Sequence, residues 1–395
     1  MKETTFNPHL EALRGYAALM VLFHHLTYLP EICPGFSFYN EFLPYTFPGH
    51  LMVMVFFMLS GYVIGLSSQR AEKFDAISYL KKRALRIYPI YLVAILFTVV
   101  LFLPIWEEVL GSLLFLQNLV VANLHQNEPL WSLNHEVIYY LLAVPILVRR
   151  INPILVLALL ALIILYSTFV CPLPAFILTY AVGFTFWMIG YAISFMKKEV
   201  EPSSNELASC FILLLGYEYI NFFQAAFQHL PFWHSEGKYL QHLVSQYELV
   251  LLPICTYVML VCTGKATRAK QVLYYALYFT STFMLLYFVV VDKFFNRPLL
   301  FFPTFCLLLA WLASQQRFWN VSIGSWTRLG SISYALYVIH APILHAIGRI
   351  EYFTGTLAFF WLRFLLCTML AVILSYFLEK KFQPWVKGKL SAQIV

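Results

Sequence analysis

The chain of 395 residues is 61% hydrophobic and only 11% charged. A soluble domain carries roughly 25% charged residues, so this sequence has too little polar surface to face water on all sides, which excludes a soluble globular protein. The formal net charge of +7 would favour nucleic-acid binding in a soluble protein, but in a membrane protein it is typical of cytoplasmic loops, and no nucleic-acid partner is expected.

Apolar stretches long enough to cross a bilayer recur along the whole chain, since a spanning helix needs about 20 largely apolar residues. They are expected at residues 11–29, 48–66, 88–104, 130–148, 152–170, 174–195, 206–226, 246–263, 272–291, 298–313, 331–350 and 357–378. Crowding in the later segments leaves ten spans as an alternative to twelve. The sequence therefore predicts an all-α, polytopic transmembrane helical bundle of 10–12 spans. A single membrane domain over residues 1–385 and a short basic cytoplasmic tail at 386–395 are expected.

Lysine and arginine are unevenly distributed between the connecting segments. If the N-terminus lies inside, the inner segments hold twenty of the 26 Lys and Arg residues and the outer segments hold four. The remaining two, Arg14 and Arg363, fall within expected spans. Because cytoplasmic loops are enriched in these residues, both termini are predicted to be cytoplasmic. The longest polar stretch, at about 227–247, is then an outer loop.

The first expected span contains two ionisable side chains, which are unfavourable inside a membrane and are commonly functional there. Arg14 and His25 are eleven residues apart. Eleven residues are three helical turns, so the two side chains share one helix face about 16 Å apart. The alternative is a snorkelling Arg14 near the inner surface and an interfacial His25 near the outer surface.

The span that begins near residue 130 places a carboxylate at a similar depth. Trp131 and Ser132 are expected at its outer boundary, and Glu136 lies one to two turns deeper, close to the depth of His25. A carboxylate that accepts a hydrogen bond from an imidazole fixes its tautomer and raises its basicity. Tyr139 follows Glu136 on the same face. A structural Glu136, hydrogen-bonded within the bundle, is the alternative.

A second group of polar residues is expected at the inner side. Arg83 and Arg86 lie where the third span leaves the cytoplasm, and Ser60 lies in the inner half of the second span. Together with Arg14 they would form a basic pocket, and the planar fork of arginine suits phosphate because it binds two oxygens at once. Alternatively, these residues are the basic side chains that ordinarily flank membrane spans on the cytoplasmic side.

The eleventh expected span carries Tyr337, near one stripe with Ser333 and Tyr334, and His340 close to mid-membrane. A buried His340 that is hydrogen-bonded to a neighbouring residue is favoured over a catalytic His340. Pro342 follows and can kink the helix.

Five short motifs, spread over residues 13 to 342, resemble segments of the acyltransferase-3 family of membrane acyltransferases and occur in the order typical of that family. They are LRGYAALMVLFHH, FFMLSGYVIG, RALRIYP, LWSLNHEVIYYL and LGSISYALYVIHAP. The family carries an arginine and a histidine separated by ten residues in its first span, and Arg14 and His25 match that spacing. Each motif is weak alone, whereas five in order are specific.

This resemblance implies transfer of an acyl group, with acetyl the commonest expectation, from cytoplasmic acyl-CoA to a hydroxyl of a saccharide or lipid-linked glycan on the outer side. A bacterial cytoplasmic membrane is the expected location, with membrane lipids as further partners. We expect His25 to act as general base with Glu136 orienting it. The residues expected to bind the acyl-CoA donor are Arg14, Ser60, Arg83 and Arg86, and those expected to bind the acceptor are Trp131, Ser132, Tyr139 and Tyr337.

Several alternatives remain open. Direct attack on the thioester and an acyl-histidine intermediate are both compatible with these residues. No metal is expected, and the sequence does not determine the oligomeric state. A proton-coupled secondary transporter is the alternative function, since buried His and Glu residues suit such carriers. The two related halves common in transporters are not evident in this sequence.

Overall fold

The computed structural model describes residues 7–43, 45–70, 74–221, 248–290, 300–315 and 322–392. Within these residues every regular element is a helix, and β-pairing is limited to two isolated bridges, Gln117 with Val121 and Lys198 with Lys265. The predicted all-α fold is therefore confirmed. The outer loop predicted at about 227–247 lies outside the described residues.

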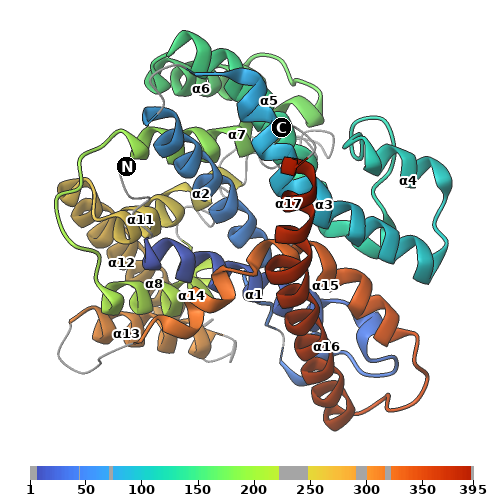
Figure 1. The fold of residues 1–395 in the computed structure, drawn as a ribbon. Coiled ribbons are helices and arrows are strands. Elements are labelled where there is room, and N and C mark those ends of the chain that lie inside the picture. Colours follow the sequence, from blue (N-terminus) through green and yellow to red (C-terminus); the bar gives the residue numbers. More distant parts are fainter. Residues whose placement is uncertain are drawn as a thin grey trace. The chain divides into compact units, whose positions relative to one another are not determined.

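The helices follow the expected segments closely (Figure 1). In chain order they are α1 (Pro8–Tyr28), α2 (Gly49–Gln69), α3 (Ala76–Phe102), α4 (Trp106–Leu113), α5 (Trp131–Arg149), α6 (Pro153–Phe169), α7 (Ala175–Ser194), α8 (Ser204–Gly216), α11 (Leu252–Thr263), α12 (Thr267–Val290), α13 (Phe301–Ser314), α14 (Gly324–Gly330), α15 (Ser333–Gly348), α16 (Leu357–Phe377) and α17 (Gln383–Ala392). Three short 3₁₀ or π segments matter below: η1 (Pro30–Ile32), η3 (His125–Leu130) and η8 (Leu378–Phe382). Each expected span overlaps a helix, whereas the short helix α4 was not expected.

Six segments of the described chain are long and apolar enough to cross a membrane, and a seventh is added if α14 and α15 form one bent span. The 71° bend of that pair lies ahead of Pro342, and α15 continues through this proline. Helix α1 is outside this set, since it carries Glu11, Arg14 and three histidines. The total of ten to twelve spans and the side on which the termini lie stay predictions.

The chain divides into two compact units, each assembled from segments far apart in the sequence. Unit 1 comprises Met1–Leu10, Met54–Glu72 and Arg150–Gly324. Unit 2 comprises Glu11–Val53, Lys73–Arg149 and Ser325–Val395. The motif FFMLSGYVIG lies in unit 1, whereas the other four motifs lie entirely in unit 2. A single membrane domain over residues 1–385 stays a prediction.

Glycines permit a close contact between α2 and α7 in unit 1. A Cβ atom at Gly61 on α2 would overlap the carbonyl oxygen of Trp187 on α7. A Cβ atom at Gly190 on α7 would in turn overlap the carbonyl oxygen of Met58 on α2. The two backbones therefore touch, which small residues permit between membrane helices. The glycine of the motif FFMLSGYVIG thus has a packing role.

Glycines also bring together the elements of unit 2 that carry the candidate site. A Cβ atom at Gly15 on α1 would lie 2.6 Å from the backbone nitrogen of Gly330, and one at Gly330 would overlap the carbonyl oxygen of Glu11. Because α14 leads directly into α15, this contact fixes α1 relative to the start of α15. Helix α15 also packs against α3 and α16, and α17 packs against α3 (Figure 1).

Candidate active site

Two histidines meet in unit 2, His25 from α1 and His340 from α15. The Nε2 atom of His340 lies 3.3 Å from the Nδ1 atom of His25, and the ring centroids are 5.0 Å apart. Each Nδ1 atom also contacts a carbonyl oxygen one turn earlier in its own helix: Val21 for His25 at 2.8 Å, and Leu336 for His340 at 3.1 Å. His340 is fully buried and His25 is half-buried.

These carbonyl contacts assign the tautomers of both rings. A carbonyl oxygen only accepts hydrogen bonds, so Nδ1 is the protonated nitrogen in each histidine. The Nδ1–H of His25 is then shared between its own helix and the lone pair of His340 Nε2, and the Nε2 atom of His25 keeps its lone pair. A neutral imidazole oriented in this way can act as a general base.

The sequence predicts Glu136 as the residue that orients His25, but in the described part of the chain the hydrogen bonds of His25 go to Val21 and His340. Glu136 on α5 accepts a hydrogen bond from Tyr140, one turn later in the same helix. His340, for which the sequence favoured a structural role, supplies the contact instead. The catalytic role of Glu136 stays a prediction.

Arg86 on α3 is held from two sides. Its Nη1 atom lies 2.7 Å from the Oε2 atom of Glu379 in η8, and the two side chains are 32% and 5% exposed. The guanidinium group also lies over the ring of Tyr334 on α15, 5.2 Å from the centroid. The Tyr334 hydroxyl donates to the carbonyl oxygen of Ile87 at 2.7 Å. The motifs RALRIYP and LGSISYALYVIHAP are thus in direct contact.

Arg83, one turn before Arg86 on α3, lies near the rings of Tyr79 and Tyr140, at 6.0 and 5.9 Å from their centroids. Tyr140 is the residue whose hydroxyl donates to Glu136. A chain of contacts therefore runs from the Arg83 guanidinium through Tyr140 to the Glu136 carboxylate. The predicted pairing of Arg83 with Arg86 in one basic cluster is consistent with this placement.

The C-terminal part of the chain adds residues to this cluster that the sequence analysis missed. Glu379, Gln383 and Lys387 are four residues apart, the spacing that places side chains on one helix face. The Gln383 side chain donates to the carbonyl oxygens of Leu85 and Arg86, at 2.6 and 3.3 Å. The exposed Lys387 interacts electrostatically with Arg86 and Glu379. The segment predicted as a basic tail continues α17 as a helix through Ala392.

The other two residues predicted to bind the donor are placed differently. Arg14 pairs with Glu11 one turn earlier on α1, with Nη1 and Oε1 3.3 Å apart and both side chains partly exposed. Ser60 is half-buried on α2 and belongs to unit 1, whereas the three arginines belong to unit 2. A role for Arg14 and Ser60 in donor binding stays a prediction.

Two of the predicted acceptor residues are in direct contact. The buried hydroxyls of Ser132 and Tyr337 share a hydrogen bond of 2.7 Å, and Tyr337 also donates to the carbonyl oxygen of Pro129. Trp131 stacks on the ring of His50 with centroids 5.8 Å apart. Tyr139 is fully buried. Ser132 and Tyr337 therefore act as internal contacts between η3, α5 and α15.

Helix α15 connects these groups in sequence order. Tyr334 contacts Arg86 near its start, His340 contacts His25 near its middle, and His345 lies near its end. Tyr334 and His345 are eleven residues apart, which is about 16 Å along a helix. A basic cluster at one end of α15 and a histidine pair further along it therefore belong to one continuous element.

Comparison with known proteins identifies a family and a relative. A family model described as an acyltransferase domain matches residues 7–380. The chain is 31% identical over 149 residues to the acyltransferase MdmB of Streptomyces mycarofaciens. The matched part covers 34% of this chain and 37% of that protein, so the chain matches little more than a third of its relative. No solved structure matches the chain.

Proposed function

Because the chain belongs to the acyltransferase-3 family, we propose that it is a membrane-bound acyltransferase that moves an acyl group from acyl-CoA to a hydroxyl of a saccharide or lipid-linked glycan. Acetyl is the simplest donor group. Following the distribution of lysine and arginine, the donor binds from the cytoplasm and the acceptor arrives from the outer side. The membrane that we expect is the inner membrane of a bacterium.

The observation that carries this proposal is the pairing of His25 with His340. The Nε2 lone pair of His25 accepts the proton of the acceptor hydroxyl while the oxygen attacks the thioester carbonyl carbon. The new C–O bond forms, the C–S bond breaks, and the proton passes from His25 to the departing CoA thiolate. His340 supports the positive charge on His25, because its neutral Nε2 atom accepts the Nδ1–H bond that strengthens as the ring becomes an imidazolium.

The basic cluster of Arg83, Arg86 and Lys387 is suited to the phosphates of CoA, since arginine binds phosphate oxygens in pairs and lysine adds a point charge. Glu379 fixes one edge of the Arg86 guanidinium and Tyr334 lies on its face. We expect the pantetheine arm to extend along α15 toward the histidine pair. A catalytic contribution from Glu136 would act through Tyr140, its hydrogen-bond partner beside Arg83.

The experiment that tests this function separates chemistry from donor binding. The purified protein in nanodiscs is given radiolabelled acetyl-CoA and a saccharide acceptor, and CoA release, acetyl transfer and acetyl-CoA affinity are measured. We expect His25→Ala to lower kcat by a factor of roughly 10²–10⁴ while acetyl-CoA affinity is retained.

His24→Ala is the matched control, since His24 lies next to His25 but bonds the carbonyl oxygen of Phe47 at 2.7 Å. This variant should keep most of the transfer activity. Normal transfer by His25→Ala would refute the mechanism, and failure of the wild-type protein to bind any acyl-CoA would refute the function.

A further inference from the structure

A pocket of about 480 Å³ lies at the far end of α15 from Arg86, entirely within unit 2. Its walls come from η1, the end of α3, η3 and the end of α15. The residues that matter here are Glu31, Phe102, His125, Gln126, His345 and Arg349. All of these segments lie in loops or span ends that the lysine and arginine distribution predicts on the outer side.

We propose that this pocket is the acceptor site and that it holds a neutral, hydroxyl-rich ring such as a sugar residue. This inference rests on the proposed function and adds the place at which its saccharide acceptor binds. The sequence predicts the acceptor at Trp131, Ser132, Tyr139 and Tyr337. Because the Ser132 hydroxyl is buried and bonded to Tyr337, it is less suited to bind an incoming ligand than the open pocket.

The pocket lies beyond the histidine pair along α15, and two further histidines line it. The rings of His125 and His345 lie 6.1 Å apart. His345 follows His340 by five residues on α15, about 7.5 Å along the helix. A ligand in the pocket therefore lies little more than one helical turn beyond the histidine pair along α15, whereas Arg86 contacts Tyr334 near the start of that helix.

The charges of the lining argue for a neutral ligand. Glu31 carries a negative charge and Arg349 a positive one, whereas the cluster around Arg86 is mainly positive and suits phosphate. Gln126 is half-buried, and its amide makes no hydrogen bond to the rest of the described chain. A free amide beside a carboxylate and an aromatic ring can bind several hydroxyls of a sugar and stack against its apolar face.

The rim of the pocket is fixed before any ligand binds. Arg349 lies 4.3 Å from the centroid of the Phe102 ring and donates to the carbonyl oxygen of Leu101 at 2.9 Å. Behind the rim, the buried Arg363 side chain donates to five backbone carbonyl oxygens. They belong to Ile32, Ile347, Ile350, Tyr352 and Phe353. A rigid rim lowers the entropy lost when a ligand is ordered in the pocket.

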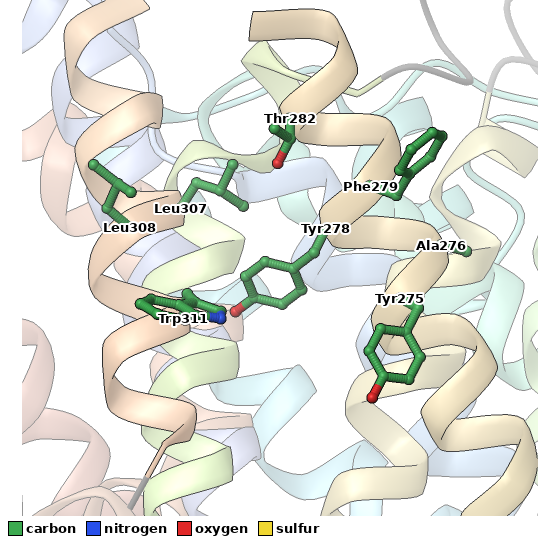
Figure 2. Close-up of a pocket in the computed structure, with 8 residues that line it drawn as sticks. All are labelled: Tyr275, Ala276, Tyr278, Phe279, Thr282, Leu307, Leu308 and Trp311. Carbon is green, nitrogen blue, oxygen red and sulfur yellow. The ribbon is translucent and has the colours of Figure 1, made fainter. Parts of the chain in front are cut away.

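A larger groove between α12 and α13 in unit 1 has a different lining. Figure 2 shows the side chains of Tyr275, Phe279, Leu308 and Trp311 around it. This lining is mainly aromatic and aliphatic and carries no charged group. It offers few partners for the hydroxyls of a sugar, so the smaller polar pocket is the better acceptor site.

The test measures both substrates in the same variants. Wild type, Gln126→Ala and Gln126→Trp are reconstituted in nanodiscs and assayed with acetyl-CoA and a panel of methyl glycosides. We expect Gln126→Ala to raise the KM for the best glycoside about tenfold, as the loss of one or two hydrogen bonds implies. Gln126→Trp, which fills the pocket, should abolish transfer. Acetyl-CoA affinity should be unchanged in both. Glu107→Ala, in the exposed part of α4, is the control and should match wild type.

The outcomes separate this inference from the proposed function. If wild type acetylates a glycoside and both Gln126 variants do so with unchanged KM, the pocket assignment is overturned and the function stands. If wild type binds acetyl-CoA but transfers acetyl to no glycoside, the assignment to a neutral sugar is overturned. If wild type does not bind acetyl-CoA, the proposed function fails, and the inference that depends on it fails as well.

Discussion

Arg86 is expected to stabilise the fold through its ion pair with Glu379 and also to bind a phosphate of CoA, and these two roles can be measured separately. Glu379 is 5% exposed and bonded to Arg86 at 2.7 Å, so Arg86→Ala leaves a buried carboxylate without its main partner. Breaking a buried pair in this way costs about 3–5 kcal/mol. Because the Arg86 side chain is 32% exposed and water screens such pairs, we expect a smaller loss of about 2–3 kcal/mol of unfolding free energy.

The double variant Arg86→Ala/Glu379→Ala removes both charges. Its stability should return to within about 1 kcal/mol of wild type, because no buried charge is left without a partner. Acetyl-CoA affinity should not return. Loss of a charge-assisted phosphate contact worth about 1.5–3 kcal/mol lowers affinity by roughly tenfold to a hundredfold, and this loss should persist in the double variant.

The assay combines thermal unfolding of the purified protein in detergent with calorimetric titration of acetyl-CoA. Lys389→Ala, an exposed cation in α17, controls for the removal of one positive charge. Recovery of wild-type acetyl-CoA affinity in the double variant would show that Arg86 only maintains the fold, and would refute the phosphate role. If the single variant Arg86→Ala is as stable as wild type, the buried-charge reasoning is wrong.

Three further predictions concern the site and the packing around it. His340→Ala should lower kcat up to about tenfold through loss of one hydrogen bond, with acetyl-CoA affinity unchanged. His340→Gln can still accept a hydrogen bond from His25 and should recover part of the lost kcat. Equal kcat in wild type and both variants would contradict the pairing. Gly61→Ala should destabilise the protein by about 1–3 kcal/mol, because the added Cβ would overlap backbone. A Cβ added at Gly388 meets nothing within 4 Å, so Gly388→Ala should leave stability unchanged or slightly raised. Thermal unfolding of the two variants compares these effects. Arg363→Lys should lose about 3 kcal/mol, since one ammonium group cannot satisfy five carbonyls, and wild-type stability in that variant would contradict the role given to its guanidinium.

The identity of the helices was predictable from local sequence. A run of about 20 apolar residues has few stable conformations in a membrane other than a helix, because every backbone polar group must be bonded internally. For that reason each expected span overlaps a helix. The short helix α4 was missed because its eight residues, with Glu107 and Glu108 in the first turn, resemble a polar connecting loop.

The residues of the candidate site were only partly predictable. From residue type and spacing the sequence predicts His25, Arg83 and Arg86 as site residues, and these roles stay predictions. It selected Glu136 as the partner of His25 from depth alone, and depth along a helix does not determine which neighbouring helix faces a side chain. Glu379 was overlooked because it lies 293 residues from Arg86 along the chain, in a segment whose lysines indicated a cytoplasmic tail.

The sequence by itself determined an all-helical, apolar chain of the acyltransferase-3 type and the helix that carries each polar residue. Composition and periodicity fix the helices because these depend only on neighbours within a few turns, whereas the family resemblance comes from the five motifs and their order. Only the tertiary structure decided that His340 meets His25 and that Glu379 meets Arg86. Those pairs depend on which helix faces touch, and contacts such as the one between Gly15 and Gly330, where backbone meets backbone, select one arrangement from many with the same helices.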